Sequence, residues 1–237
     1  MSEKLFKGFD NDTIFLLSEN RFNDSKFHYE EVKEILKQKA TVPMRSICSD
    51  LSEMLFQIDE QMNLIPTKMV SRIRRDTRRS KNKEMYRDNM WCMFMRNKQH
   101  WRYQPCMWFE FMPGGFSIGV GVYFSEPSYF EYFRKVLSEN QEEFRKAVLS
   151  CEKCGALPSF QRYKKDKPGT ENIDYSLKNY YNARDLYYIY YSSDLTPLFD
   201  GSVYNIIEEC IRAYEPMYKF LLKVMEKIIS EKGQNYD

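Results

Sequence analysis

The sequence has little of what several classes of protein require. Only two of its 237 residues are histidine, His28 and His100, and no H-E-x-x-H pair occurs, so hydrolytic zinc chemistry is disfavoured. No uninterrupted apolar run approaches the roughly 18 residues that a membrane span needs, and the polar start of the chain does not resemble a signal peptide. We therefore expect a cytoplasmic protein with no membrane partner.

The sequence also lacks a large excess of charge of either sign. The 36 Lys and Arg residues nearly balance the 34 Asp and Glu residues, which leaves a net charge of +2. A protein with so small a charge attracts neither nucleic acid nor a membrane surface through its overall field. Any anionic partner must therefore be bound by a local patch.

Cysteine is present but does not suggest a disulfide framework. Several of the six cysteines lie within apolar stretches, which is typical of reduced, buried thiols. Cys151-Glu-Lys-Cys154 has the spacing of a zinc or redox pair, but no second C-x-x-C exists to complete four zinc ligands. We predict no zinc at Cys151 and Cys154, no other metal site and no cofactor.

Apolar residues at helical spacing predict three helices near the N-terminus. Asp10 is placed to cap the first helix and Asp24 to cap the second. The third helix is predicted from Pro43, in its first turn, to Ile58. Its apolar residues advance by threes and fours: Met44, Ile47, Cys48, Leu51, Met54, Leu55 and Ile58.

The central part of the chain has the pattern of strands. Segments rich in aromatic and branched residues, bounded by turn residues, predict strands at 69–75, 90–95, 106–112, 116–124 and 186–191. Pro113-Gly114-Gly115 is predicted to join two of them as a tight hairpin. In the next strand the large side chains alternate with Ser117, Gly119 and Gly121, so one face is nearly bare and can receive a close helix or a ligand.

Helices return in the second half of the chain. Ser125 is predicted to cap one helix, and Asn140 is predicted to start another that ends near Gly155. An apolar stripe over 203–229 predicts a C-terminal helix that is broken or kinked near Pro216.

The order of these elements predicts the fold class. We find no internal repeat and no flexible linker, although 161–174, with its lysines, is predicted to be an exposed loop. The sequence therefore predicts one domain, residues 1–237, of the α+β class: a mainly antiparallel sheet of about five strands flanked by N-terminal and C-terminal amphipathic helices.

The strongest signal is a concentration of positive charge at the start of the predicted sheet. Residues 72–83 contain seven basic residues and one acid, Asp76, a local charge of +6, so the other residues sum to −4. In a strand over 69–75, Arg72, Arg74 and Asp76 would share one face, and Asp76 would pair an arginine that points inward. The remaining guanidinium groups are planar forks suited to phosphate or carboxylate.

Two other interpretations of this region stay open. Runs of charge are usually solvated, so the basic run also fits a surface strand end with salt bridges to acids elsewhere in the chain. Nearby aromatic residues offer stacking surfaces for bases, but aromatic strand residues more often pack in a core. These residues are Trp91, Trp101, Tyr103, Trp108, Tyr187, Tyr188, Tyr190 and Tyr191.

The basic run resembles a motif of a known family. The uncharacterised domain-of-unknown-function 2461 proteins, found in bacteria and some fungi, carry a segment like R-I-x-R-D-T-R-F-S-K-D-K-T-P-Y-K. The present sequence is similar to it at Arg72, Ile73, Arg75, Asp76, Thr77, Arg78, Ser80, Lys81, Lys83, Tyr86 and Arg87. It departs from the motif at Arg79, where the family has an aromatic residue, and at Met85, where the family has proline.

Three weaker matches extend the resemblance over nearly the whole chain. Asn20-Arg21-Phe22 resembles the family's opening, the glycines from Gly114 to Gly121 resemble its glycine-rich hairpin, and Tyr214-Glu-Pro216 resembles the start of its closing helix. The resemblance implies a shared fold and a candidate site at the basic motif. It implies no activity, substrate or cofactor.

Three functions fit these observations. The first is a binding module for a phosphorylated or other anionic small molecule, or for a nucleic-acid backbone, and the small net charge favours a compact anion over long duplex DNA. Its binding residues would be Arg72, Arg74, Arg75, Arg78, Lys81 and Lys83. The second is an enzyme acting on a phosphorylated substrate, with Asp76 as general base or metal-side carboxylate and Tyr86 as proton donor. Besides the adjacent Glu84, Glu110 is the other candidate acid. The third is a structural or interaction protein held together by an Arg–Asp network. The sequence leaves enzymatic activity and oligomeric state open.

Overall fold

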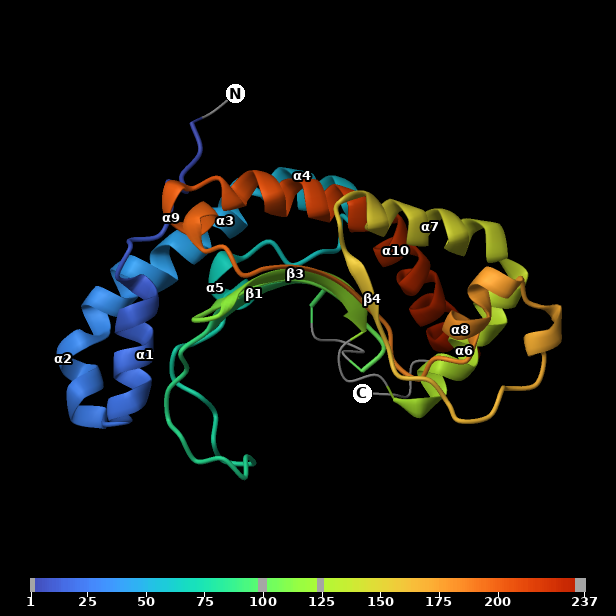
Figure 1. Ribbon diagram of the computed structural model, residues 1–237, viewed down its shortest axis with the longest axis horizontal. Coiled ribbons are helices and arrows are strands. Elements are labelled where there is room, and N and C mark those ends of the chain that lie inside the picture. Colours follow the sequence, from blue (N-terminus) through green and yellow to red (C-terminus); the bar gives the residue numbers. More distant parts are fainter. Residues whose placement is uncertain (1–2, 98–101, 123–125, 233–237) are drawn as a thin grey trace. The chain divides into compact units, whose positions relative to one another are not determined.

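The computed structural model describes residues 3–97, 102–122 and 126–232, and Figure 1 shows their helices and strands. Five strands form one antiparallel sheet in the order β1-β2-β3-β5-β4. The predicted α+β class is therefore confirmed. The strands are β1 Met90–Phe94, β2 Pro105–Met112, β3 Gly115–Val122, β4 Leu157–Ser159 and β5 Tyr187–Ser192.

Helices precede, separate and follow the strands. The α-helices are α1 Thr13–Asn23, α2 Lys26–Leu36, α3 Val42–Asp50, α4 Ser52–Ile58, α5 Pro66–Met69, α6 Pro127–Glu139, α7 Gln141–Lys153, α8 Lys178–Tyr181, α9 Thr196–Asp200 and α10 Val203–Lys232. A π-helical turn, Lys37–Thr41, and two 3-10 turns, Thr170–Asn172 and Tyr175–Leu177, complete the set. Within the described ranges, no helix is long and apolar enough to cross a membrane.

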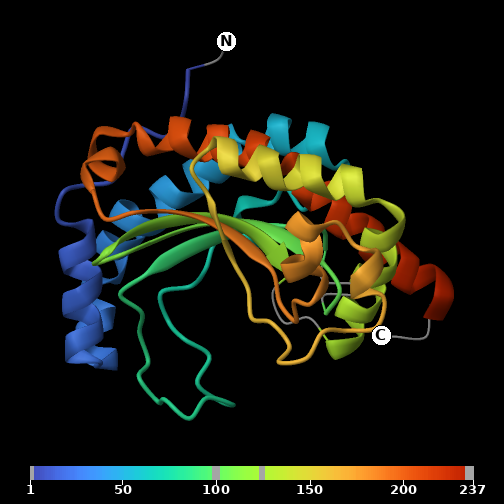
Figure 2. The ribbon, with the colours of Figure 1, turned by 45° about the vertical axis from the view of Figure 1, so that its right-hand side comes forward.

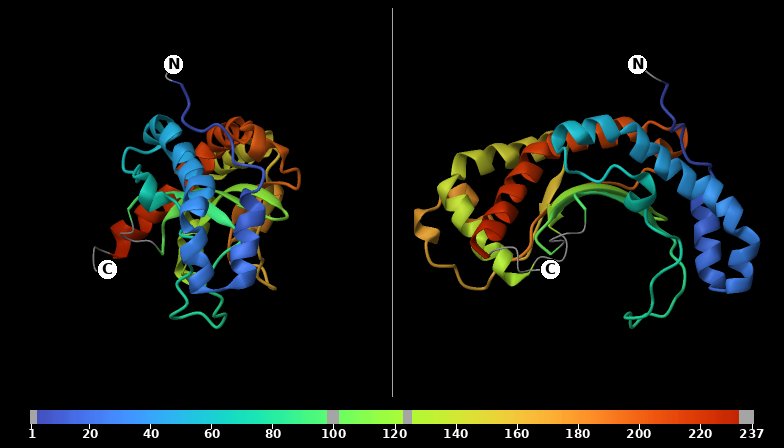
Figure 3. Two further views of the ribbon diagram at one scale, coloured as in Figure 1. Left: turned by 90° about the vertical axis from the view of Figure 1, so that its left-hand side faces the viewer. Right: turned by 180° about the vertical axis from the view of Figure 1, so that it is seen from behind.

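The chain divides into two compact units. The first contains Met1–Phe94, Trp108–Ser117 and Tyr191–Glu208, and the second contains Met95–Met107, Ile118–Tyr190 and Glu209–Asp237. Each has its own aromatic core. In the first unit, rings contact one another at Phe6, Phe9, Phe109, Phe111 and Phe116. In the second, where Figure 3 shows α6 and α7 beside α10, the contacting rings are Phe130, Phe133, Phe144 and Phe220.

The first two helices form an antiparallel pair, but their predicted caps are wrong. The first helix begins after Asp12 rather than Asp10. The second is capped by Ser25, whose Oγ accepts a hydrogen bond from the backbone N–H three residues on (3.5 Å). Asp24 instead adopts a left-handed conformation at the end of α1, and its carboxylate accepts a hydrogen bond from the backbone N–H of Met85 (2.7 Å). The carboxylate that was predicted to cap α2 therefore forms a tertiary hydrogen bond instead.

The third predicted helix is two helices, α3 and α4, which are separated at Leu51. A π-helical turn joins α2 to α3, and Pro43 explains it, because proline has no N–H to donate to the carbonyl of Lys39. The hydroxyl of Thr13 donates to that carbonyl instead (3.2 Å). The carbonyl is thus satisfied, and the contact ties α1 to the turn.

Four of the five predicted strands are confirmed, as β1, β2, β3 and β5. The predicted strand at 69–75 is wrong, because this segment makes only two isolated bridges, Val70 to Cys92 and Arg74 to Tyr86. The predicted end of β3, at Phe124, lies outside the described residues. Sequence analysis missed β4, a three-residue edge strand with proline at its centre, because so short and exposed a segment has no hydrophobic alternation.

The helices of the second unit follow the predicted plan with small shifts. The N-cap of α6 is Glu126, while Ser125, the predicted cap, lies outside the described residues. The N-cap of α7 is Asn140 as predicted, although its side chain donates to the carbonyl of Val136 (2.8 Å). Gly155 follows α7 with a φ of +80°, which confirms the predicted helix end.

The last helix, α10, continues through Pro216, so the predicted break there is wrong, whereas the alternative of a kink stays a prediction. Proline lacks the N–H that would continue the helical hydrogen bonds, which destabilises a helix. The burial of Tyr214 and Met217, on either side of Pro216, offsets this cost. The Tyr214 hydroxyl also donates to the carbonyl of Ile118 in β3 (2.9 Å). Packing against β3 therefore keeps this part of α10 helical.

The small residues of β3 make room for its neighbour in the sheet. All eight residues of β3 are buried, so neither face is open to solvent. A Cβ atom on Gly121 would lie 2.5 Å from the carbonyl oxygen of Leu186 and in contact with the ring of Tyr187. At Gly121 the bare position is thus filled by the chain entering β5.

This close approach predicts the effect of a single methyl group. We expect Gly121→Ala to lower the free energy of unfolding by about 1–3 kcal/mol, because the Leu186 carbonyl belongs to the backbone and cannot rotate away. Chemical denaturation measures the change. Gly114→Ala in the hairpin is the matched control, since nothing lies within 4 Å of its added Cβ. Equal stability of the two variants would contradict the close packing at Gly121.

Candidate functional site

The basic run lies on an irregular loop between α5 and β1, which we call the basic arm (residues 70–89). Figure 2 shows the arm extending away from β1. The inner part is closed by backbone hydrogen bonds from Ser71 to Trp91 (2.8 Å), from Arg87 to Ile73 (3.0 Å) and from Arg75 to Met85 (2.7 Å). The outer part, residues 76–83, is mostly exposed.

The arm is attached to the first two helices. The ring of Tyr86 stacks on that of Tyr29 in α2, with centroids 4.7 Å apart. Arg21 in α1 donates to Asp88 (2.7 Å) and to Glu84 (3.0 Å). Together with the bond from the Met85 backbone to α1, these contacts fix the returning branch of the arm against both helices.

Glu84 is the central acid of this attachment. Its Oε2 accepts hydrogen bonds from Arg21, from Arg75 (3.3 Å) and from the side chain of Asn82 (2.9 Å). The hydrogen bond from Asn82, followed by the charges of Arg21 and Arg75, lowers the pKa of Glu84 below its usual 4.5. Arg75, a predicted ligand-binding residue, is thus half-buried in an internal ion pair.

Asp76 pairs with its neighbour and not with a buried arginine. The carboxylate accepts hydrogen bonds from Arg78 Nε (2.9 Å) and Nη2 (2.6 Å) and from the Arg78 backbone N–H (3.2 Å). These bonds hold the pKa of Asp76 well below its usual range and raise that of Arg78. Since both side chains are more than half exposed, the predicted inward-facing Arg–Asp pair is wrong.

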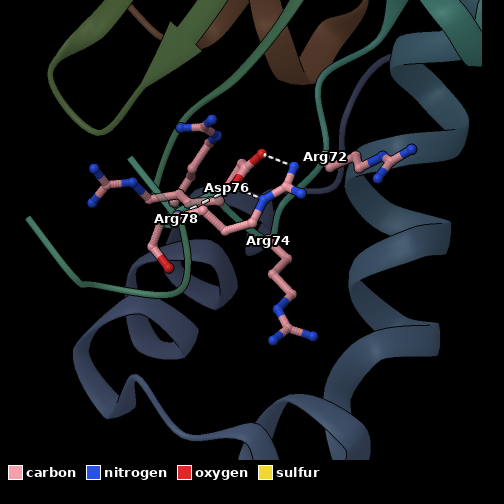
Figure 4. A pocket seen from close by; sticks show the side chains of 7 residues that line it. Arg72, Arg74, Asp76 and Arg78 are labelled. Atoms are coloured by element: carbon pink, nitrogen blue, oxygen red, sulfur yellow. Dashed lines mark hydrogen bonds and ion pairs between the residues drawn. The ribbon is translucent and has the colours of Figure 1, made fainter. Parts of the chain in front are cut away.

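The predicted alternation of side chains along the first branch is correct although the strand is not. Arg72, Arg74 and Asp76 are exposed, while Ile73 between them is buried and Arg75 is half-buried. The side chains of Arg72, Arg74 and Asp76 therefore all reach solvent. Figure 4 shows that Arg72 and Arg74 point in different directions, whereas Arg78 turns to Asp76.

Most cations of the arm have no acidic partner. Of the seven basic residues in 72–83, only Arg75 and Arg78 form an ion pair within the described residues. The other five are Arg72, Arg74, Arg79, Lys81 and Lys83. Lys83 donates to the carbonyl of Thr77 (3.0 Å), which fixes its position but does not neutralise its charge. The arm thus carries a local excess of positive charge in the folded protein.

Two open hollows lie along the arm. One, of about 510 Å³, is shown in Figure 4 and is lined by Arg72, Arg74, Arg75, Asp76, Thr77, Arg78 and Arg87. The other, of about 520 Å³, is bordered by Asp76, Arg78 and Arg79. Their lining is almost entirely charged, whereas pockets for neutral small molecules are mostly apolar. The surface suits an anion.

The two predicted proton-transfer residues have separate partners. Asp76 is engaged by Arg78, and Tyr86 is almost fully buried in its stack on Tyr29, where burial raises its pKa. The third candidate, Glu110, accepts a hydrogen bond from Asn89 (2.5 Å). Each group is therefore occupied by a contact within the protein.

The aromatic residues near the run differ in burial: two are buried, four are half-buried and Tyr191 is exposed. Tyr103 and Tyr188 are almost fully buried. The guanidinium carbon of Arg87 lies over the ring of Trp91, 4.4 Å from the ring centre. Trp101 lies outside the described residues. The core interpretation thus holds for Tyr103 and Tyr188.

Sequence reasoning gave no functional role to Arg21 or Asp88 and assigned Asp24 only to a helix cap, yet all three join the arm to α1. The one feature of the sequence that could have indicated these ion pairs is the position of Glu84 and Asp88 directly after a run of cations. Their partner on α1 lies 63 residues away from Glu84 and 67 from Asp88, so the sequence alone could not identify it.

Cys151 and Cys154 lie at the end of α7. Among the described residues, no three His, Cys, Asp or Glu side chains are grouped as metal ligands. Hydrogen bonds from the Cys210 thiol and from the Ala156 backbone lower the pKa of Cys154 below its usual 9.0, while burial raises that of Cys151. Cys154 is half-buried and the other five cysteines are buried.

The contacts of Glu84 predict a pH dependence. A lowered pKa in the folded state means that the carboxylate stabilises the fold above its unfolded pKa and loses this effect as pH falls through the folded pKa. We expect Glu84→Gln to lower the midpoint of denaturation at about pH 7, and the difference from wild type to shrink as the pH falls below 4.5 and through the lowered pKa of the folded state. Glu53→Gln, at an exposed position without an ion pair in the described chain, is the control. A difference that stays constant with pH would refute this role of Glu84.

The state of Cys154 predicts selective labelling. We expect iodoacetamide at about neutral pH to alkylate Cys154 before the five buried cysteines, because the thiolate is the reactive form. Peptide mass spectrometry over a time course measures the order, and Cys154→Ser should remove the fast phase. Earlier labelling of Cys151 would show that the assignment is wrong.

Comparison with known proteins agrees with the resemblance of the basic motif. The model of a family described as "Conserved hypothetical protein (DUF2461)" matches residues 12–220, a span that runs from the start of α1 through the basic arm and all five strands into α10. Among curated proteins, none matches the chain. Because the family match covers most of the sequence, the chain belongs to the DUF2461 family of conserved hypothetical proteins.

Proposed function

We propose that the protein is a binding module whose basic arm binds a ligand with more than one phosphate group. The observation that carries this proposal is the charge imbalance on the arm. Its acids, Asp76, Glu84 and Asp88, are engaged by Arg78, Arg75 and Arg21. Five further cations, Arg72, Arg74, Arg79, Lys81 and Lys83, form no ion pair within the described residues.

The spacing of the cations supports a ligand with several charges. Arg72 and Arg74 point apart, so one small anion would meet only one of them (Figure 4). Phosphate groups along a nucleotide, an oligonucleotide or a polyphosphate can contact separate guanidinium groups. The net charge of −4 on the residues outside 72–83 limits attraction to the arm, which favours a short ligand over long duplex DNA.

Catalysis by the arm has weaker support. General acid–base catalysis is most efficient when the pKa of the group lies near the working pH. The pKa of Asp76 is shifted far below that range by Arg78, and burial shifts the pKa of Tyr86 further above it. Binding therefore fits the electrostatics of these residues better than proton transfer does.

The test compares the binding of labelled oligonucleotides by the wild-type protein and by a variant in which two cations of the arm are neutralised. We expect short single-stranded RNA to bind with an affinity that falls between about 50 and about 200 mM salt, and unlabelled tripolyphosphate to compete. Arg74→Gln with Lys81→Gln should weaken binding about tenfold or more and reduce the salt slope by about two, with an unchanged melting temperature. Fluorescence anisotropy measures both effects, and single-stranded and duplex DNA compare ligand types.

Lys146→Gln with Lys153→Gln is the matched control. This pair removes the same charge from exposed positions on α7, where neither lysine forms an ion pair within the described chain. The control should bind as wild type does. Equal losses in the two double variants would indicate an effect of bulk charge and refute a site on the arm, as would wild-type affinity in the arm variant.

A further inference from the structure

Two cysteines that are distant in the sequence lie close together in the second unit. Cys154 is the residue that ends α7, and Cys210 lies in α10. Their thiols share a hydrogen bond, which Cys210 donates. Both residues belong to the same compact unit, in which α7 and α10 lie side by side (Figure 3). The fold therefore places two thiols in contact.

Backbone and ring contacts around the pair agree with this placement. A Cβ atom on Gly155, the residue after Cys154, would lie 3.8 Å from the ring of Tyr190 in β5. The backbone N–H of Tyr190 donates to the hydroxyl of Tyr214 (3.2 Å), one turn after Cys210 on α10. The end of α7 and this part of α10 thus meet at the same residue of β5.

The two thiols differ in their access to solvent. Cys210 has 1% of its surface exposed, whereas Cys154 is half-buried, so Cys154 is the one that a small oxidant in solution reaches. The Cys154 thiol donates to the carbonyl of Cys151 (3.1 Å), which holds it at the end of α7. The hydrogen bond from Cys210 lowers the pKa of Cys154, and the same bond raises the pKa of Cys210. Cys154 is therefore the nucleophile of the pair, and Cys210 is the thiol held beside it.

A thiol pair in the first unit has the contact without the access. Cys48 in α3 and Cys92 in β1 also share a hydrogen bond, and both are fully buried. Burial raises the pKa of Cys92 well above its usual 9.0. A neutral thiol that no oxidant reaches is inert, so this pair is a comparison within the same chain.

We propose that Cys154 is a site of oxidation by peroxides, and that oxidised Cys154 forms a reversible disulfide with Cys210. Accessible cysteines that lie next to a second thiol are the ones that undergo reversible oxidation in redox-sensing proteins. Cys154 follows the last residue of α7, and Gly155 after it has a φ of +80°, so the backbone there is not held in a helix as the sulfur atoms approach. The site lies wholly in the second unit and does not depend on the basic arm.

The reaction has two steps. In the first, the Cys154 thiolate attacks one oxygen of hydrogen peroxide: the S–O bond forms, the O–O bond breaks, and the hydroxide that leaves takes up the proton released by the thiol. Cys154 is then a sulfenic acid. In the second, the Cys210 sulfur attacks the Cys154 sulfur: the S–S bond forms, the S–O bond breaks, and the hydroxide leaves with the Cys210 proton as water. The two thiols are oxidised, and the peroxide is reduced to two molecules of water.

The test maps disulfides in the full chain after oxidation. Reduced protein, freed of reductant, is treated with hydrogen peroxide at about neutral pH, its remaining thiols are alkylated, and its peptides are analysed by mass spectrometry without reduction. We expect a cross-link between the peptides of Cys154 and Cys210, which dithiothreitol reverses. Cys48 and Cys92 should remain free thiols under the same conditions.

Substitutions separate the two steps. Cys210→Ser should stop the reaction at the sulfenic acid of Cys154, which dimedone traps, and Cys210→Ala repeats this test without a buried hydroxyl. Cys154→Ser, at the half-buried position, should leave Cys210 a free thiol after peroxide, because no sulfenic acid forms for it to attack. Cys48→Ala, which removes one thiol of the buried pair, is the control and should leave the cross-link unchanged.

Three results would overturn the proposal. One is a cross-link from Cys154 to Cys151 in place of Cys210. Another is wild-type Cys154 that stays reduced or is oxidised only to sulfinic acid. The third is oxidation of Cys210 in the Cys154→Ser protein. Alkylation by iodoacetamide reads only the reactivity of Cys154, so that prediction and the disulfide can fail independently.

Discussion

The carboxylate of Glu84 is the constraint on which the basic arm depends. It accepts hydrogen bonds from Arg21 in α1, from Arg75 in the outgoing branch of the arm and from Asn82 in the returning branch. One acid therefore joins three segments. Half-exposed ion pairs are individually weak, but several bonds to one carboxylate form a network that orders long side chains together. With the stack of Tyr86 on Tyr29, this network gives a loop without regular secondary structure a defined place on the first unit.

The same network determines which charges the arm presents. Glu84 and Asp88, the acids that follow the basic run, form ion pairs with Arg21 and Arg75. Asp76 forms an ion pair with Arg78. The surface that results is charged but hydrated, so its unpaired cations cost little in the absence of a ligand. Affinity for phosphate there would come from the combined effect of several exposed charges and would be sensitive to salt.

The surroundings of Arg134, in α6 of the second unit, present the opposite physical case. One guanidinium is withdrawn from water, so the lack of an ion-pair partner among the described residues has a large energetic consequence, whereas Arg72 or Arg74 on the arm loses little by remaining unpaired.

The α+β class, four of the five strands, the alternation of Arg72, Ile73 and Arg74 and the family could all be predicted from the sequence, because these depend on local periodicity and on residue order. It did not determine the ends of the first helices, since Asp24 and the carbonyl of Lys39 are used by residues distant in the chain. Three features follow from the folded chain alone: Asp76 stays at the surface, Glu84 attaches the arm, and Arg134 is buried without an acidic partner among the described residues. The partners of a charged side chain are set by long-range proximity in three dimensions, and this proximity leaves no periodic signal in the sequence.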